Sequence, residues 1–198
     1  LALAVVPLVA GHFVLQVPTS IGFDDVKEGT APCGGFDITS RTGVSEWPVA
    51  GAPIQIISTH PQAEWEIKAA LLNDTFRYLL PKISQQGLGE FCLPSVPGIK
   101  EWEGLDGVMQ MIQHAVDGAL YQCAAIKFVG GAAASVPDSC KNASSIVASF
   151  EPGTDTGTLA TVSTGMSMTA SATTTGAAGG GPANRTATAT GAGVGTAA

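Results

Sequence analysis

Two histidines are the residues in this chain best suited to chemistry. His12 follows an apolar and small-residue run in which Val9 and Gly11 stand at the −3 and −1 positions of a cleavage site. Cleavage after Gly11 would make His12 the first residue, so that its α-amine and ring Nδ1 could chelate one metal ion. His60 would supply a third nitrogen. Three nitrogen ligands in a flattened arrangement suit Cu(II), which also leads the affinity order for divalent metals.

A carboxylate is the expected fourth ligand, and Asp117 is the candidate. The pair Asp117-Gly118 is also common in hairpin turns for backbone reasons alone. Asp24 and Asp25 are rival carboxylates, and His114 is a third imidazole that is either a surface group or a satisfied core group. The α-amine has an ordinary pKa of about 8 and must lose its proton to bind, so metal affinity should fall as pH drops.

Short strands are predicted to position these groups. Apolar and polar residues alternate along 13–17, 63–71, 107–114 and 119–129, and 54–58 is a short β-rich run. Asp117-Gly118 separates the last two alternating stretches as a hairpin turn. Many short strands with frequent glycine and proline predict an all-β fold, an immunoglobulin-like β-sandwich with disulfides.

Four cysteines, Cys33, Cys92, Cys123 and Cys140, follow the predicted leader. An even number in an exported protein predicts two disulfides, with three connectivities open. We favour Cys33–Cys140 and Cys92–Cys123, because the second pair would cross-link two strands predicted to be neighbours. No two cysteines form a Cys-x-x-Cys pair, which argues against a zinc knuckle.

The composition divides the chain into three parts. We expect a truncated signal peptide over 1–11, a copper-binding domain over 12–150, and a disordered Ser/Thr/Gly/Ala-rich stalk over 151–198. The stalk is expected to be glycosylated and resembles the spacer before a glycolipid anchor; a flexible linker is the alternative. Sequons for N-glycosylation occur at Asn73, Asn142 and Asn184.

Charge and motif content exclude several function classes. The net charge is −7, from 9 basic and 16 acidic residues, and no basic patch interleaves with aromatics, which argues against nucleic-acid binding. No nucleophile elbow or phosphate-binding glycine loop is present. Trp47, Trp65 and Trp102 are candidates for a sugar-stacking platform, although tryptophans in such a domain are more often core residues.

Four blocks of sequence together resemble the fungal copper acquisition factor family, whose members are extracellular and similar to lytic polysaccharide monooxygenases. The blocks are His12-Phe13, the stretch 18–25, Pro32-Cys33-Gly34-Gly35-Phe36, and the stretch 117–124 that contains Tyr121-Gln122-Cys123. The resemblance implies a β-sandwich with one copper in a histidine brace. It assigns His12, His60 and Asp117 as the ligands. The family usually has Asp two residues after the cysteine of the last block, where this chain has Ala125.

The resemblance also implies a function. A coordinating aspartate favours Cu(II) and takes space that an oxygen species would need, so we expect copper binding for acquisition or homeostasis at the cell surface. The expected partners are the copper ion, a cell-surface copper transporter and cell-wall polysaccharide, and the expected membrane contact is a glycolipid anchor. The alternatives are a copper-dependent polysaccharide oxygenase and a metal-free cell-wall mannoprotein.

Overall fold

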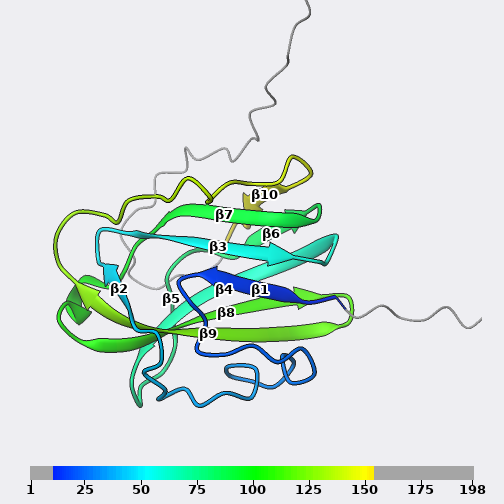
Figure 1. Cartoon of the computed structure of the whole chain (residues 1–198). Helices are drawn as coiled ribbons and strands as arrows, with labels where there is room; N and C mark the ends of the chain where they lie inside the picture. The colour runs from blue at the N-terminus through cyan, green and yellow to red at the C-terminus, as the bar shows by residue number, and fades with distance from the viewer. Residues whose placement is uncertain (1–10, 154–198) are drawn as a thin grey trace, which may run out of the picture.

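Two β-sheets lie face to face in the computed structural model, which describes residues 11–153 (Figure 1). The predicted signal segment before Gly11 and the tail from residue 154 lie outside the described residues. The smaller sheet has the order β1-β3-β7, with bounds Phe13–Val17, Ala52–Ser58 and Gly89–Val96. The larger sheet has the order β10-β6-β4-β8-β9-β2, with bounds Val147–Phe150, Ile83–Gln86, Gln62–Leu71, Asp106–Ala115, Gly118–Val129 and Ser45–Pro48. The predicted all-β sandwich is confirmed.

Two short elements complete the described chain. Strand β5 (Arg77–Tyr78) pairs with β4, and a 3-10 turn, η1, spans Lys100–Trp102. No helix among residues 11–153 is long and apolar enough to cross a membrane.

Three of the four alternating stretches, 63–71, 107–114 and 119–129, became central strands of the larger sheet, and the fourth, 13–17, became β1 of the smaller sheet. Strands β4, β8 and β9 pair antiparallel, and β8 and β9 form the predicted hairpin. Trp65 and Ile67 from β4, with Met109 and Met111 from β8, point into the core between the sheets. All three tryptophans, Trp47, Trp65 and Trp102, are buried, so they do not form an exposed platform for sugars.

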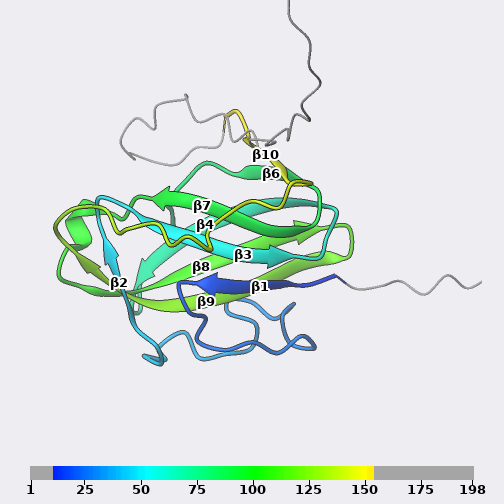
Figure 2. The ribbon, with the colours of Figure 1, turned by 45° about the horizontal axis from the view of Figure 1, so that its top comes forward.

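A long loop, residues 18–44, covers part of the outer face of the larger sheet. Figures 1 and 2 show this blue segment running alongside β9 in both views. The amide of Ile21 donates to the carbonyl of Cys123 at 2.8 Å, and Cys33 packs with Val108 and Ala125 in a second, smaller apolar cluster. The loop therefore buries outward-facing residues of β8 and β9. These two strands have apolar contacts on both faces, with the core on one side and the loop on the other.

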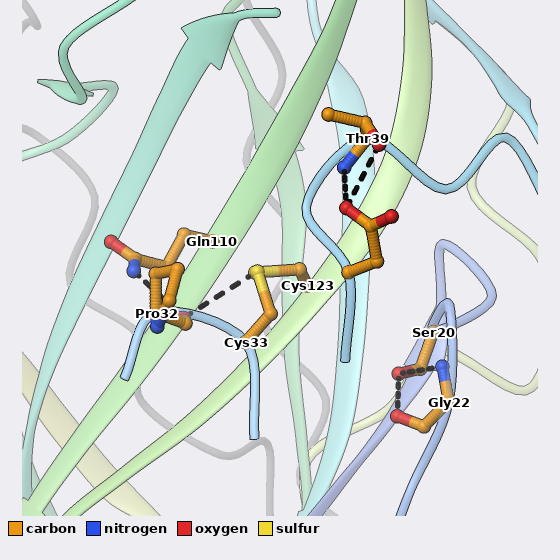
Figure 3. Close-up of a disulfide and its surroundings, with 8 residues drawn as sticks. Ser20, Gly22, Pro32, Cys33, Thr39, Gln110 and Cys123 are labelled. Carbon is orange, nitrogen blue, oxygen red and sulfur yellow. Dashed lines mark hydrogen bonds between the residues drawn. A yellow bond between two sulfur atoms is a disulfide. The ribbon is translucent and has the colours of Figure 1, made fainter. Parts of the chain in front are cut away.

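The four cysteines form two disulfides, as predicted, but the favoured connectivity was wrong. The pairs are Cys33–Cys123 and Cys92–Cys140. Cys92 lies on β7 of the smaller sheet and Cys123 on β9 of the larger sheet, so the two strands are not neighbours. Cys123 instead binds the covering loop through Cys33 (Figure 3).

The second disulfide fastens the long connection between β9 and β10 to the smaller sheet. Along this connection the amide of Ala134 donates to Gly51 and the amide of Ala143 donates to Glu90. Cys140 lies between these two points and bonds to Cys92 on β7.

Candidate metal centre

His60 is a buried histidine in the loop between β3 and β4, with only 3% of its surface exposed. Its Nδ1 lies 2.7 Å from Oε1 of Gln113, on β8, and its Nε2 lies 2.7 Å from Oδ1 of Asp117. The carbonyl of His60 accepts hydrogen bonds from Ser58 Oγ and Gln85 Nε2. Both ring nitrogens and the backbone are therefore held, which fixes the imidazole in one orientation.

Asp117 occupies the turn of the β8–β9 hairpin. Of the three aspartates considered, it is the one that meets a histidine. Burial alone would raise its pKa, but hydrogen bonds from His60 and from the Gly11 amide lower the pKa below its ordinary value. Asp117 is therefore a carboxylate, ionised at neutral pH, that lies beside a ring nitrogen of His60.

Gly11 fills the space next to this pair. Its amide donates to Asp117 Oδ2 at 3.1 Å, and a Cβ added to it would come within 2.6 Å of His60 Nε2. Real Cβ atoms do not approach other atoms so closely, so only glycine fits at this position without a shift of the neighbouring groups. In the chain as described, the residue before His12 thus lies against the imidazole of His60.

His12 lies next to the pair but does not point at it. Its amide donates to Thr59 Oγ1 at 2.7 Å, and its carbonyl accepts from the amide of Thr59 at 3.0 Å. Its ring Nδ1 lies 3.1 Å from Oε2 of Glu28. Within residues 11–153, no three His, Cys, Asp or Glu side chains are grouped closely enough to hold a metal ion. The structure therefore joins two of the three predicted ligands and brings only the backbone of the third beside them.

Glu28 and Gln122 form a buried polar pair that the sequence reasoning missed. Glu28 is 1% exposed, and its Oε1 accepts from Gln122 Nε2 at 2.7 Å. Gln122 also donates to the carbonyl of Phe13 and accepts from the amide of Leu15. Burial raises the pKa of Glu28 even though Gln122, His12 and the Phe13 amide donate to it. The pair links β1 to β9 through hydrogen bonds. In the sequence, the one indication of this pair was Gln122, which lies in the Tyr121-Gln122-Cys123 block.

The rival ligands lie elsewhere. Asp24 forms an ion pair with Lys27 within the covering loop, at 3.1 Å, and Asp25 is exposed. His114 lies on the outer face of the larger sheet, with its Nε2 3.2 Å from Glu66. Neither set of side chains reaches His60.

The predicted N-glycosylation sites differ in their surroundings. Asn73 is exposed, with a φ of 67°, between β4 and β5. Asn142 is partly buried, and its Oδ1 accepts from the amide of Cys92 at 2.7 Å. Asn184 lies outside the described residues. Glycosylation at these sites stays a prediction.

Comparison with known proteins assigns the chain to a family. A family model described as Copper acquisition factor BIM1-like matches residues 10–145, which include the whole candidate site. The chain belongs to the BIM1-like copper acquisition factor family. This membership supports a function related to copper, as predicted.

Two curated relatives are consistent with this family. An uncharacterised protein of Aspergillus fumigatus is 36% identical over 157 residues, covering 74% of this chain and 65% of the relative. Lytic polysaccharide monooxygenase-like protein X325 of Yarrowia lipolytica is 27% identical over 181 residues, covering 83% of this chain and 67% of the relative. The chain thus spans about two thirds of the length of these relatives.

Proposed function

We propose that the protein captures a copper ion outside the cell and passes it to a receiving protein, with His12, His60 and Asp117 as the ligands. One observation carries the proposal: His60 Nε2 and Asp117 Oδ1 face each other at 2.7 Å, directly beside the backbone that leads into His12. Ligands about 2 Å from one metal ion, at right angles to each other, lie about 2.8 Å apart. The spacing of these two atoms fits a shared metal ion.

Processing between Gly11 and His12 would complete the ligand set. It removes the glycine that lies on His60 and turns the amide of His12 into an amine, which can bind a metal once it has lost a proton. Chelation by this amine and Nδ1 also requires the ring of His12 to leave Glu28. The His60–Asp117 pair needs no such change, since it is already assembled.

The carboxylate favours copper handling over oxygen chemistry. A negatively charged ligand stabilises Cu(II) relative to Cu(I) and occupies a position that a reacting oxygen species would need. Release of the ion to a receiving protein then proceeds by ligand exchange. Two disulfides and an exposed sequon at Asn73 support an extracellular location, where oxidised cysteines persist. Tethering to the cell surface is part of the same proposal.

Copper titration tests the ligand assignment. The chain that begins at His12 should bind one Cu(II) and show an electron paramagnetic resonance spectrum rich in nitrogen couplings. His60→Ala should alter that spectrum and weaken binding by at least about tenfold, or about 1.4 kcal/mol. His114→Ala is the matched control and should leave both unchanged, because His114 lies on the outer face of the sheet. An unaltered spectrum in His60→Ala would show that the assignment is wrong.

The competing enzymatic function has its own test. The copper-loaded protein, incubated with a reductant and cell-wall polysaccharides, should release no oxidised oligosaccharides. Such products would overturn the proposal of copper capture and support a polysaccharide oxygenase, the activity suggested by the name of the Yarrowia relative.

A further inference from the structure

Gln113 is a fully buried glutamine on the core face of β8, in line with Met109 and Met111. A buried amide that lacked partners would destabilise the fold, whereas an apolar residue at this position would pack without that cost. Gln113 has partners at both ends: His60 Nδ1 lies 2.7 Å from its Oε1, and its Nε2 donates to Ser58 Oγ at 2.9 Å. Its presence in the core is therefore linked to His60.

The hydrogen bonds around Gln113 have a fixed direction. Ser58 Oγ donates its single hydrogen to the carbonyl of His60, so it is an acceptor toward Gln113. The amide nitrogen of Gln113 must therefore face Ser58, and the amide oxygen must face the imidazole. Because that oxygen can only accept, the hydrogen in this contact belongs to Nδ1 of His60.

We propose that Gln113, oriented by Ser58, is a positioning residue that keeps a hydrogen on Nδ1 of His60. Nε2, which donates to Asp117 in the metal-free protein, is then the nitrogen that gives up its hydrogen to bind a metal ion. Histidines that bind metals commonly donate their other ring N–H to a neighbouring acceptor, which fixes the ring and its tautomer. The part of this inference that assigns Nε2 as a metal ligand rests on the proposed function. The part that places a hydrogen on Nδ1 is independent of the proposed function.

Nitrogen NMR of the histidine rings tests the Nδ1 half without any metal. The chain has three histidines, so in the metal-free chain from His12 to Ala198 the ring signals can be assigned by substitution. Wild type should show a protected Nδ1–H on His60. Gln113→Met removes the acceptor and should lose this signal, and Ser58→Ala should weaken it because the amide of Gln113 is then free to turn. Gln113→Glu restores an acceptor oxygen and should keep it.

Gln110→Met is the matched control for stability. Gln110 is also buried on β8, three residues earlier, and its Nε2 donates to the carbonyl of Pro32 on the outer face of the sheet (Figure 3). This variant should lower the melting temperature, as we also expect for Gln113→Met, while leaving the His60 Nδ1–H signal intact. If Gln113→Met is too unstable to study, Ser58→Ala and Gln113→Glu still test the proposal.

Copper binding tests the metal half with the same variants. Gln113→Met should change the Cu(II) resonance spectrum and weaken binding by about 10- to 100-fold, while Gln113→Glu and Gln110→Met should not. An Nδ1–H signal that persists in Gln113→Met, or a copper spectrum identical to wild type, overturns the inference. If wild type itself binds no copper, the proposed function fails while the NMR result on Nδ1 still decides the role of Gln113.

Discussion

Gly11 closes the space around His60 and Asp117 in the chain that retains it. Its amide binds one carboxylate oxygen, and its Cα lies against the imidazole. If the chain is cut after Gly11, as we propose, this cover is removed and we expect His60 to become accessible.

Chemical modification of His60 tests this protection. In the chain that retains Gly11, His60 should react slowly with diethyl pyrocarbonate, and in the chain that begins at His12 it should react several times faster. Gly11→Ala in the unprocessed chain should also speed the reaction, because a Cβ would come 2.6 Å from Nε2 and displace the residue. Mass spectrometry of the modified peptide measures the rates. Equal rates in the Gly11 and His12 forms would contradict the protective role.

For single residues, the sequence predicts the candidate metal ligands better than the residues that orient these ligands by hydrogen bonds. The pairing of His60 with Asp117 follows from the family resemblance, and the structure brings the two together. Glu28 lies in a polar stretch that is typical of a surface loop, and its burial depends on the fold. Gln113 left no distinguishing signal, because each face of its strand carries two apolar residues and one glutamine in the sequence.

The covering loop, residues 18–44, depends on one cross-link to the larger sheet. The Cys33–Cys123 disulfide and the hydrogen bond from the Tyr121 amide to the Glu28 carbonyl fix the loop against β9. Through Glu28, this loop also reaches His12. Loss of the Cys33–Cys123 disulfide should therefore loosen the contact between Glu28 and His12 at the candidate site.

Replacement of each disulfide by serines separates stability from local order. The two cross-links span 90 and 48 residues, so loss of either should lower the free energy of unfolding by about 4 kcal/mol. Only the Cys33→Ser, Cys123→Ser variant should speed hydrogen exchange at the Tyr121 amide. The Cys92→Ser, Cys140→Ser variant is the control and should leave this amide protected. Protection of Tyr121 in both variants would mean that the loop holds without its disulfide.

The strands could be predicted from the sequence where the alternation of side chains between two faces determines the residue pattern. Strand β4 alternates because one of its faces packs in the core between the sheets, whereas β8 and β9 are buried on both faces over much of their length. The disulfide pairing was not predictable, because it depends on which sheet each strand joins and on where the covering loop lies. Those are contacts between segments far apart in the sequence, and the periodicity of a short segment does not predict them.

At the scale of the whole molecule, a charged cluster on the outer face of the larger sheet links stability to pH. The Glu66 side chain is largely buried and contacts Lys68, Lys82 and His114. Burial alone would raise its pKa, but hydrogen bonds from Lys68, Tyr78 and Lys82 lower the pKa to about 2. A folded-state pKa below the unfolded value of 4.5 stabilises the fold above that pH, and this contribution is lost as pH falls toward 2.

Urea unfolding across this pH range measures the contribution. Above pH 4.5, Glu66→Gln should be less stable than wild type by on the order of 1–2 kcal/mol, since solvent screens part of the interaction. The difference should shrink as pH approaches 2. Glu46→Gln, at the exposed position of β2, serves as the control and should show little difference at any pH. A constant gap between Glu66→Gln and wild type would contradict the low pKa.

The contacts around the candidate centre join parts of the chain that are far apart in sequence. Gly11 and Asp117 are 106 residues apart, His60 and Asp117 are 57 apart, and His12 and Thr59 are 47 apart. A ribosome must therefore release the β8–β9 hairpin before Asp117 can join the two histidines. The proposed ligand set therefore places copper loading late in biosynthesis, because a chain that still lacks Asp117 has no complete site.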